Sequence, residues 1–122
     1  MGCRMLERSQ VYFVDLNPIQ GREQAGRRPC LIVSSDAINR QPLVVTVVVG
    51  TKSSRIRKDY PVNVRVSARE SGLPEDTTFL CFQVRSLDPS RFRDSDGGPA
   101  GVLPPRRMAE VDAALRLVLE LG

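Results

Sequence analysis

The stretch VYFVDLNPIQGREQAGRRPCLIVSS, residues 11–35, holds two apolar segments separated by a charged one. Residues 11–16 alternate in polarity and residues 30–35 form a second apolar run, which predicts two core strands. The intervening residues 21–29, GREQAGRRP, are predicted to form a loop because they combine two glycines with a proline, and Pro29 fixes the start of the second strand. Charged side chains crowd this loop, among them Glu23, Arg27 and Arg28. A turn that only joined two strands would not require them.

Working outward from this stretch, three more segments have the pattern of strands. Residues 44–49 are rich in Val and apolar on both faces, which predicts a central strand. Residues 62–66 alternate in polarity and predict a half-buried strand, and residues 77–88 predict another strand with a bend near Gln83. Residues 88–101 are rich in Gly, Pro, Asp and Ser, which predicts a loop.

The end of the chain, LPPRRMAEVDAALRLVLELG, predicts a helix. Pro105 suits its first turn, and apolar residues then recur at helical spacing: Met108, Val111, Leu115 and Val118. Three further leucines, Leu117, Leu119 and Leu121, widen this stripe beyond what one small sheet would cover. We therefore expect a second subunit to cover the remainder, which predicts a homodimer.

These segments together indicate a mainly β fold of the α+β class. Five or six short strands with one closing helix predict a small, strongly bent sheet or barrel. A chain of 122 residues supports one modest core, and no repeat or linker divides it. We therefore expect residues 1–122 to form a single domain.

The positive charge of the chain is concentrated in two loops. The formal net charge is +4, from 18 Lys and Arg against 14 Asp and Glu. Residues 21–28 hold three Arg and one Glu, and residues 51–58 hold four Lys or Arg and no acid. A localised positive field favours an anionic polymer as partner, although a solvated basic loop would produce the same composition.

The residue types that are missing exclude several kinds of chemistry. The chain has no His, so it has no Ser-His-Asp triad and no His-ligated zinc. It has no Walker motif and no paired carboxylates typical of a two-metal nuclease. The three cysteines match no zinc or disulfide spacing, and Cys30 and Cys81 lie in apolar runs, which predicts buried, reduced thiols and a cytoplasmic location. No signal peptide or membrane-spanning run is present, so we expect no membrane association.

The remaining chemistry centres on Arg, Thr, Ser and Glu beside glycine turns. Guanidinium groups bind phosphate in a bidentate manner and stabilise charge that accumulates on phosphorus. Two Tyr, four Phe and no Trp disfavour an aromatic base-stacking platform. The composition permits phosphoryl transfer within RNA that needs no metal, because the 2′-hydroxyl supplies the nucleophile and the protein supplies charge and positioning.

The order of these motifs resembles the MazF/PemK family of toxin endoribonucleases. The likeness starts with DLNP and the pattern G-x-E-Q-x-G-x-R-P, followed by an apolar strand. It continues through VVVGTKSSRIRKDYPVNV and FLCFQVRSLD and ends in GVLPPRRMAEVDAALRLVLEL. It covers most of the chain from Val11 to Leu121.

The resemblance implies an SH3-like β-barrel with short helices, assembled as a symmetric dimer. Family members cleave single-stranded RNA, usually mRNA, at a short sequence without a metal or other cofactor. The expected products carry a 2′,3′-cyclic phosphate and a 5′-hydroxyl. A cognate, MazE-like antitoxin would neutralise the toxin by laying an extended segment along the RNA groove.

The same resemblance assigns roles to individual residues. Arg28 and Thr51 match the catalytic Arg and Thr of the family, and Glu23 matches the acidic residue of the G-x-E-Q motif. Glu23 would position Arg28 or accept the proton of the 2′-hydroxyl, and a simple loop ion pair is the alternative. The residues expected to contact RNA are Gln24, Arg27, Lys52, Ser53, Arg55, Arg57, Lys58 and Gln83, although the two glutamines would equally satisfy backbone groups.

Two departures from the family pattern bear on specificity. Arg22 stands where the family often has Ser, and Phe82 stands where it commonly has Glu. Both change the charge of the expected groove. The fold would equally suit a CcdB-like toxin that binds DNA gyrase without catalysis, or an RNA-binding barrel that leaves RNA intact. The combination of Glu23, Arg28 and Thr51 favours RNA cleavage over these alternatives.

Overall fold

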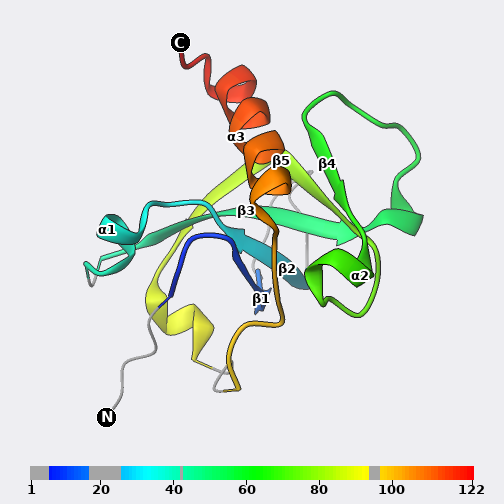
Figure 1. The fold of residues 1–122 in the computed structure, drawn as a ribbon. Helices are drawn as coiled ribbons and strands as arrows, with labels where there is room; N and C mark the ends of the chain where they lie inside the picture. The colour runs from blue at the N-terminus through cyan, green and yellow to red at the C-terminus, as the bar shows by residue number, and fades with distance from the viewer. Residues whose placement is uncertain (1–5, 17–25, 42, 94–96) are drawn as a thin grey trace.

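The computed structural model describes residues 6–16, 26–41, 43–93 and 97–122. Within these ranges a six-stranded antiparallel sheet is accompanied by three α-helices and two 3₁₀ turns (Figure 1). The strands are β1 (Gln10–Asp15), β2 (Arg27–Ile32), β3 (Val45–Lys52), β4 (Asn63–Val66), β5 (Thr77–Leu87) and β6 (Gly101–Val102). The other elements are α1 (Asp36–Asn39), η1 (Ser53–Arg55), α2 (Ala68–Ser71), η2 (Pro89–Phe92) and α3 (Pro105–Leu119).

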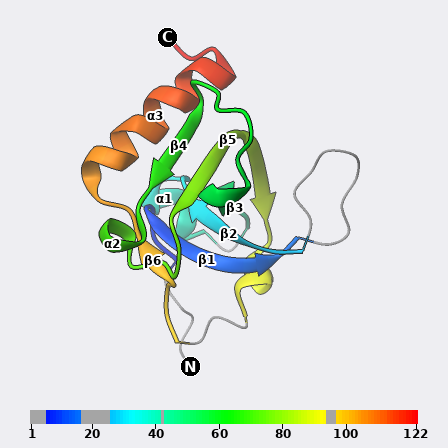
Figure 2. The same ribbon diagram turned by 90° about the vertical axis from the view of Figure 1, so that its right-hand side faces the viewer.

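The sheet is strongly curled, and its strands follow the order β4-β5-β3-β2-β1-β6. Figure 2 shows the curl of the sheet, with α3 lying across β4 and β5. The segment predicted from residues 44–49 is the interior strand β3, which pairs with both β2 and β5. The sequence therefore predicted the mainly β, barrel-like architecture and its closing helix correctly.

Side-chain alternation gives the sheet two apolar faces. On the face under α3, Val11, Leu31 and Val48 pack against Met108 and Val111 of the helix. On the other face, the intervening strand positions pack together with residues from the chain start and η2: Leu6, Tyr12, Val14, Leu16, Cys30, Ile32, Val45, Val47, Val49, Leu87 and Phe92. Since both faces of the central strands are buried, their sequences are continuously apolar.

The predicted bend near Gln83 is a bulge in β5. Val48 lies opposite Val84, whereas the next residue of β3, Val49, lies opposite Leu80. Residues 81–83 are therefore extra in β5, and a bulge of this kind bends its strand and increases the local twist. The bulge therefore contributes to the curl of the sheet.

The second strand differs from its prediction. We expected Arg27 and Arg28 to lie in a loop, but β2 begins at Arg27, and Phe13 of β1 lies opposite Pro29. The sheet tolerates Pro29 because pairing of β2 with β3 begins only at Cys30, so no partner requires an N–H at the proline on that side. The two arginines therefore stand on a strand end, which positions them more firmly than a loop would.

The C-terminal helix begins at Pro105, as predicted, and buries Met108, Val111 and Ala114. Leu117, Leu119 and Leu121 remain 68%, 51% and 58% exposed, so this chain alone does not cover them. The homodimer that would cover them stays a prediction. Of the helices in the described ranges, none has the length and apolar character needed to cross a membrane.

Candidate active site

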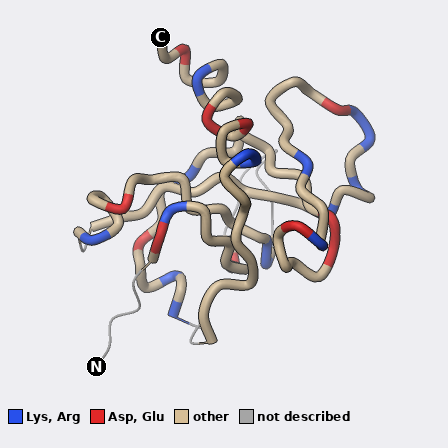
Figure 3. Tube along the Cα trace, in the orientation of Figure 1, with Lys and Arg blue, Asp and Glu red and all other residues tan. Residues whose placement is uncertain are grey.

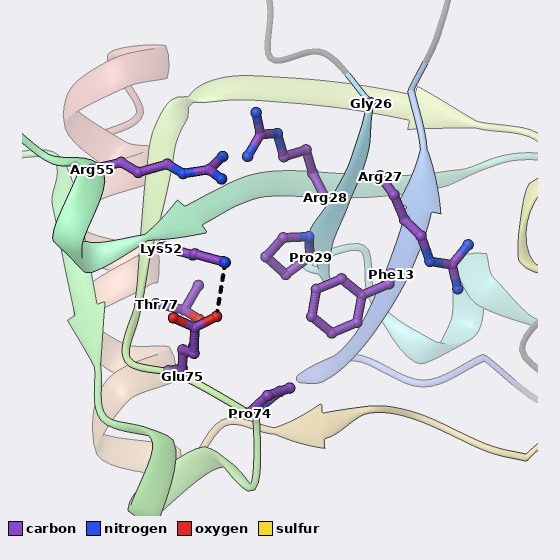
Figure 4. A pocket seen from close by; sticks show the side chains of 10 residues that line it. All are labelled: Phe13, Gly26, Arg27, Arg28, Pro29, Lys52, Arg55, Pro74, Glu75 and Thr77. Atoms are coloured by element: carbon purple, nitrogen blue, oxygen red, sulfur yellow. Dashed lines mark hydrogen bonds and ion pairs between the residues drawn. The ribbon is translucent and has the colours of Figure 1, made fainter.

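A pocket of about 360 Å³ opens where the start of β2, the end of β3 and the turn before β5 meet (Figure 4). Its upper part is basic and one of its walls is apolar. The lining residues are Phe13, Gly26, Arg27, Arg28, Pro29, Lys52, Arg55, Pro74, Glu75 and Thr77. The pocket therefore joins the two basic segments that the sequence distinguished.

Three cations reach this pocket from three elements: Arg28 from β2, Lys52 from the end of β3 and Arg55 from η1. The guanidinium groups of Arg28 and Arg55 point toward one another across its upper part, and Lys52 lies below them, whereas Arg27 extends away (Figure 4). The Lys52 Nζ lies 3.0 Å from the Oε2 of Glu75. Two facing guanidinium groups repel each other unless an anion lies between them, and phosphate is the anion whose geometry they match.

The basic segment after β3 is held in place by the turn before β5. The Ser53 N–H donates to the Asp76 carbonyl at 2.9 Å, and the Ser53 hydroxyl lies 2.8 Å from the Thr78 hydroxyl. The Ile56 N–H then closes η1 on the Ser53 carbonyl at 3.1 Å. Because Lys52 and Arg55 lie close to Ser53 in the chain, these hydrogen bonds fix the backbone positions from which both side chains extend.

The turn before β5 is itself anchored by Asp76. Its carboxylate accepts the Ala68 N–H at 2.8 Å and an Arg65 N–H at 3.3 Å. The Ala68 bond, with help from Arg65, holds the pKa of Asp76 below its ordinary value. One residue away, the Thr77 hydroxyl donates to the Glu75 carbonyl at 3.0 Å. Glu75 is therefore presented from a fixed backbone.

Thr51 is not among the residues that line this pocket. It is 5% exposed, and its neighbour Lys52 points to the pocket side. Of the two residues that match the family's catalytic Arg and Thr, Arg28 therefore lines the pocket and Thr51 does not.

The two cysteines in the described ranges are buried thiols, as predicted. Burial raises the pKa of Cys30 to about 12, although nearby Arg85 opposes the shift, and burial raises the pKa of Cys81 to about 11. Both thiols stay protonated at neutral pH and supply no nucleophile. Within the same ranges, no three Cys, Asp or Glu side chains gather as metal ligands.

Comparison with known proteins identifies the family. The sequence model of the PemK-like, MazF-like toxins of type II toxin–antitoxin systems matches residues 7–119. The chain belongs to this family. The resemblance stated from the motifs is therefore confirmed.

Solved structures agree with this family assignment. MazF from Deinococcus radiodurans is 26% identical, with 98% of this chain and 100% of that one covered and a TM-score of 0.78. An endoribonuclease from a mycobacterial species is 25% identical, covering 98% and 95% of the two chains with a TM-score of 0.73. A mycobacterial endoribonuclease in complex with its cognate antitoxin is also 25% identical, covering 98% of each chain with a TM-score of 0.72.

The residues predicted to contact RNA in this MazF-like toxin divide into three groups. Arg27, Lys52 and Arg55 line the pocket. Arg57 and Lys58 are exposed on the loop that follows, where Figure 3 shows positive charge, and the Lys58 Nζ lies 5.4 Å from the centre of the Tyr60 ring. The Ser53 hydroxyl is hydrogen-bonded to the Thr78 hydroxyl, and Gln83 lies in the β5 bulge. Glu23 and Gln24 lie outside the described residues.

Sequence reasoning missed four of the lining residues: Phe13, Pro74, Glu75 and Thr77. Phe13 has the appearance of an ordinary core position in an alternating strand. Glu75 belongs to the short segment LPEDTT, which carries no recognisable motif. Only the fold brings this segment to the basic strand ends.

Proposed function

We propose that this chain is a toxin endoribonuclease that cuts single-stranded RNA, mRNA in the cell, at a short sequence and without a metal. The observation that carries the proposal is the pair of guanidinium groups of Arg28 and Arg55 facing one another above Lys52. This arrangement suits a phosphodiester that gains charge as it reacts. Membership in the family and the endoribonuclease activity named for two similar structures support the same reaction.

In the proposed reaction the RNA attacks itself. The 2′-oxygen forms a bond to the adjacent phosphorus while the bond from phosphorus to the 5′-oxygen breaks. The Glu23 carboxylate accepts the 2′-hydroxyl proton, and the departing 5′-oxygen takes a proton from water. The products are a 2′,3′-cyclic phosphate and a 5′-hydroxyl.

Arg28 and Thr51 would act on the phosphate during this step. A guanidinium does not give up its proton near neutral pH, so Arg28 would donate hydrogen bonds to the phosphate oxygens as their charge grows. The Thr51 hydroxyl would orient a phosphate oxygen or the 2′-hydroxyl. In this scheme Glu23 is the one residue that accepts a proton, and the other residues contribute positioning and positive charge.

The remaining basic residues would hold the RNA strand on either side of the cut. Arg27, Arg55, Arg57 and Lys58 would contact phosphates, Lys52 would contact the RNA strand beside them, and Ser53, Gln24 and Gln83 would contact bases. Binding by several cations predicts an affinity that falls steeply with salt concentration.

We also propose the assembly and the partner that the family suggests. A cognate antitoxin would neutralise the toxin by occupying its RNA groove, and one similar structure contains an endoribonuclease in complex with its cognate antitoxin. The exposed leucines at the end of α3 and just beyond it, Leu117, Leu119 and Leu121, would pack in a homodimer. Residues 1–122 would form one toxin domain, which acts in the cytoplasm because its mRNA substrate is there.

The test is incubation of the purified, folded chain with a long mRNA in EDTA, followed by mapping of the new ends. We expect cuts at a recurring short sequence with 5′-hydroxyl ends, and loss of cutting in Arg28→Ala. Arg40→Ala is the matched control, because Arg40 is exposed and does not line the pocket. RNA that stays intact with folded, antitoxin-free protein would overturn the proposal and favour a binding protein that does not cleave RNA.

A further inference from the structure

The lower part of the pocket differs chemically from its upper part. Below the guanidinium groups, the side chains of Lys52 and Glu75 lie on one side, and Phe13 and Pro29 lie on the other (Figure 4). Pro74 closes the bottom of the view. A flat ring placed there would contact the ring of Phe13 on one side and the polar pair at its edge.

Glu75 is unexpected in a pocket that binds RNA. Of the described residues that line the pocket, it is the one carboxylate, and a free carboxylate would repel phosphate. Its ion pair with Lys52, at 3.0 Å, offsets this charge. Both side chains remain about half exposed, at 49% for Lys52 and 52% for Glu75, so their outer atoms are accessible to a ligand. This part of the pocket therefore suits a neutral, strongly polar group rather than a phosphate.

We infer that the Lys52–Glu75 pair recognises a guanine base of the RNA, an inference that rests on the proposed function. The ammonium donates hydrogen bonds, and the two carboxylate oxygens only accept them. The pair thus offers one donor beside two acceptors. The Watson–Crick edge of guanine is the complement, with an O6 acceptor beside the N1–H and N2–H donors.

The other three RNA bases do not fit this pattern. Adenine and cytosine each offer one amino group beside a ring nitrogen acceptor, which would face a carboxylate oxygen. Uracil offers one N–H between two carbonyl oxygens, so one of them would also face the carboxylate. A buried or partly buried acceptor that faces another acceptor loses its hydrogen bond to water without replacement, which disfavours these bases.

The surroundings would hold the base and its phosphate together. The Phe13 ring offers a stacking surface, and stacking of a base on an aromatic ring is tolerant of sequence. The Glu75 backbone is held by the Thr77 hydroxyl at 3.0 Å, so the carboxylate is presented from a fixed turn. Arg28 and Arg55 lie above the base position, where the phosphate of the same nucleotide would reach them.

The test uses binding, so that it does not depend on cleavage. Heptamers with 2′-O-methyl riboses and the sequence UUUXUUU, which lack the attacking 2′-hydroxyl, are titrated with X as guanine, inosine, adenine or cytosine. Inosine differs from guanine only in lacking the N2 amino group. We expect guanine to bind about 10- to 150-fold more tightly than inosine, the range for one hydrogen bond to a charged group.

Variants locate the preference. Glu75→Ala removes both acceptors and should bind guanine and inosine with equal affinity, whereas Glu75→Gln keeps one uncharged acceptor and should show a smaller preference than the wild type. Glu7→Gln, the same change at an exposed residue away from the pocket, should keep the wild-type preference. A general loss of structure or charge would weaken the binding of the guanine and inosine heptamers alike and would leave the ratio of their affinities unchanged.

Two results would overturn the inference. One is equal binding of guanine and inosine by the wild-type chain, and the other is a preference for guanine that persists in both Glu75 variants. Neither result would change the outcome expected for RNA cleavage in EDTA. Conversely, the ratio of guanine to inosine affinities can be measured even if the chain does not cleave RNA. The two proposals therefore fail separately.

Discussion

Gly50 lies where any side chain would press on the core beneath the proposed site. It belongs to β3, immediately before Thr51, and lies opposite Phe79 of β5. A Cβ at this position would lie 2.9 and 3.0 Å from two ring carbons of Phe79 and 3.0 Å from the Cγ2 of Thr77. Phe79 is fully buried, so its ring has little freedom to move aside.

We predict that Gly50→Ala lowers the free energy of unfolding by about 1–2 kcal/mol. Overpacking of a core costs roughly 1–3 kcal/mol, and the loss of glycine flexibility in a strand returns about 0.5–1 kcal/mol of this. For a chain of this length, such a change lowers the melting temperature by about 4–8 °C. Because the strained position adjoins Thr51, RNA cleavage should fall as well.

The assay is urea unfolding followed by circular dichroism, arranged as a double-mutant cycle. Phe79→Val removes the ring carbons, so Gly50→Ala should cost about 1 kcal/mol less in that background than in the wild type. Gly97→Ala is the control, because nothing lies within 4 Å of a Cβ there, and we expect it to be neutral. A Gly50→Ala protein as stable as wild type, or a cost unchanged by Phe79→Val, would refute the packing argument.

Two further predictions concern titrating groups. Hydrogen bonds from Arg107 and a backbone N–H lower the pKa of Glu70 to about 2 from an ordinary 4.5, so the stability that Glu70 contributes is complete above pH 4.5 and lost as the pH falls toward 2. Between pH 6 and pH 3 the wild type should lose more stability than Glu70→Gln in urea unfolding, and equal losses would contradict this. Because burial keeps Cys30 and Cys81 protonated, a Cys3→Ser chain should take up no iodoacetamide at pH 8 when folded and two equivalents when unfolded. Labelling of the folded chain within minutes would count against the buried core.

The sequence predicted those parts of the fold that local pattern determines. The α3 helix follows from Pro105 and the apolar spacing after it, and β3 follows from its run of valines. The bend near Gln83 was also predicted, within the strand expected over residues 77–88. For α3 and β3 the residue types constrain the backbone without help from distant segments.

Other elements depend on contacts between distant segments. The two residues of β6 form a strand only because β1 lies beside them, and composition alone predicts a loop there. The α2 helix escaped prediction although it has a sequence signal, a capping box in which Ser67 and Glu70 bond each other's backbone N–H groups. Arg28 was assigned to a loop because Pro29 usually starts a strand rather than lying inside one.

The candidate site was predicted in part for the same reason. Motifs indicated Arg28, Lys52 and Arg55 because basic residues beside glycine turns stand out in a sequence. Nothing in the sequence linked them to Glu75, since the turn that carries it reaches the pocket only through the pairing of β3 with β5. The roles of Arg28, Thr51 and Glu23 remain predictions.

The catalytic role of Arg28 is tested by the single-turnover cleavage rate of a short RNA at saturating protein, compared among wild type, Arg28→Lys and Arg28→Ala. If Arg28 stabilises charge in the transition state, the rate for bound RNA should fall about 10²- to 10³-fold in Arg28→Ala. Arg28→Lys should recover part of the rate, because it keeps the charge but loses the bidentate fork. Cleavage of bound RNA at the wild-type rate in Arg28→Ala would contradict the account.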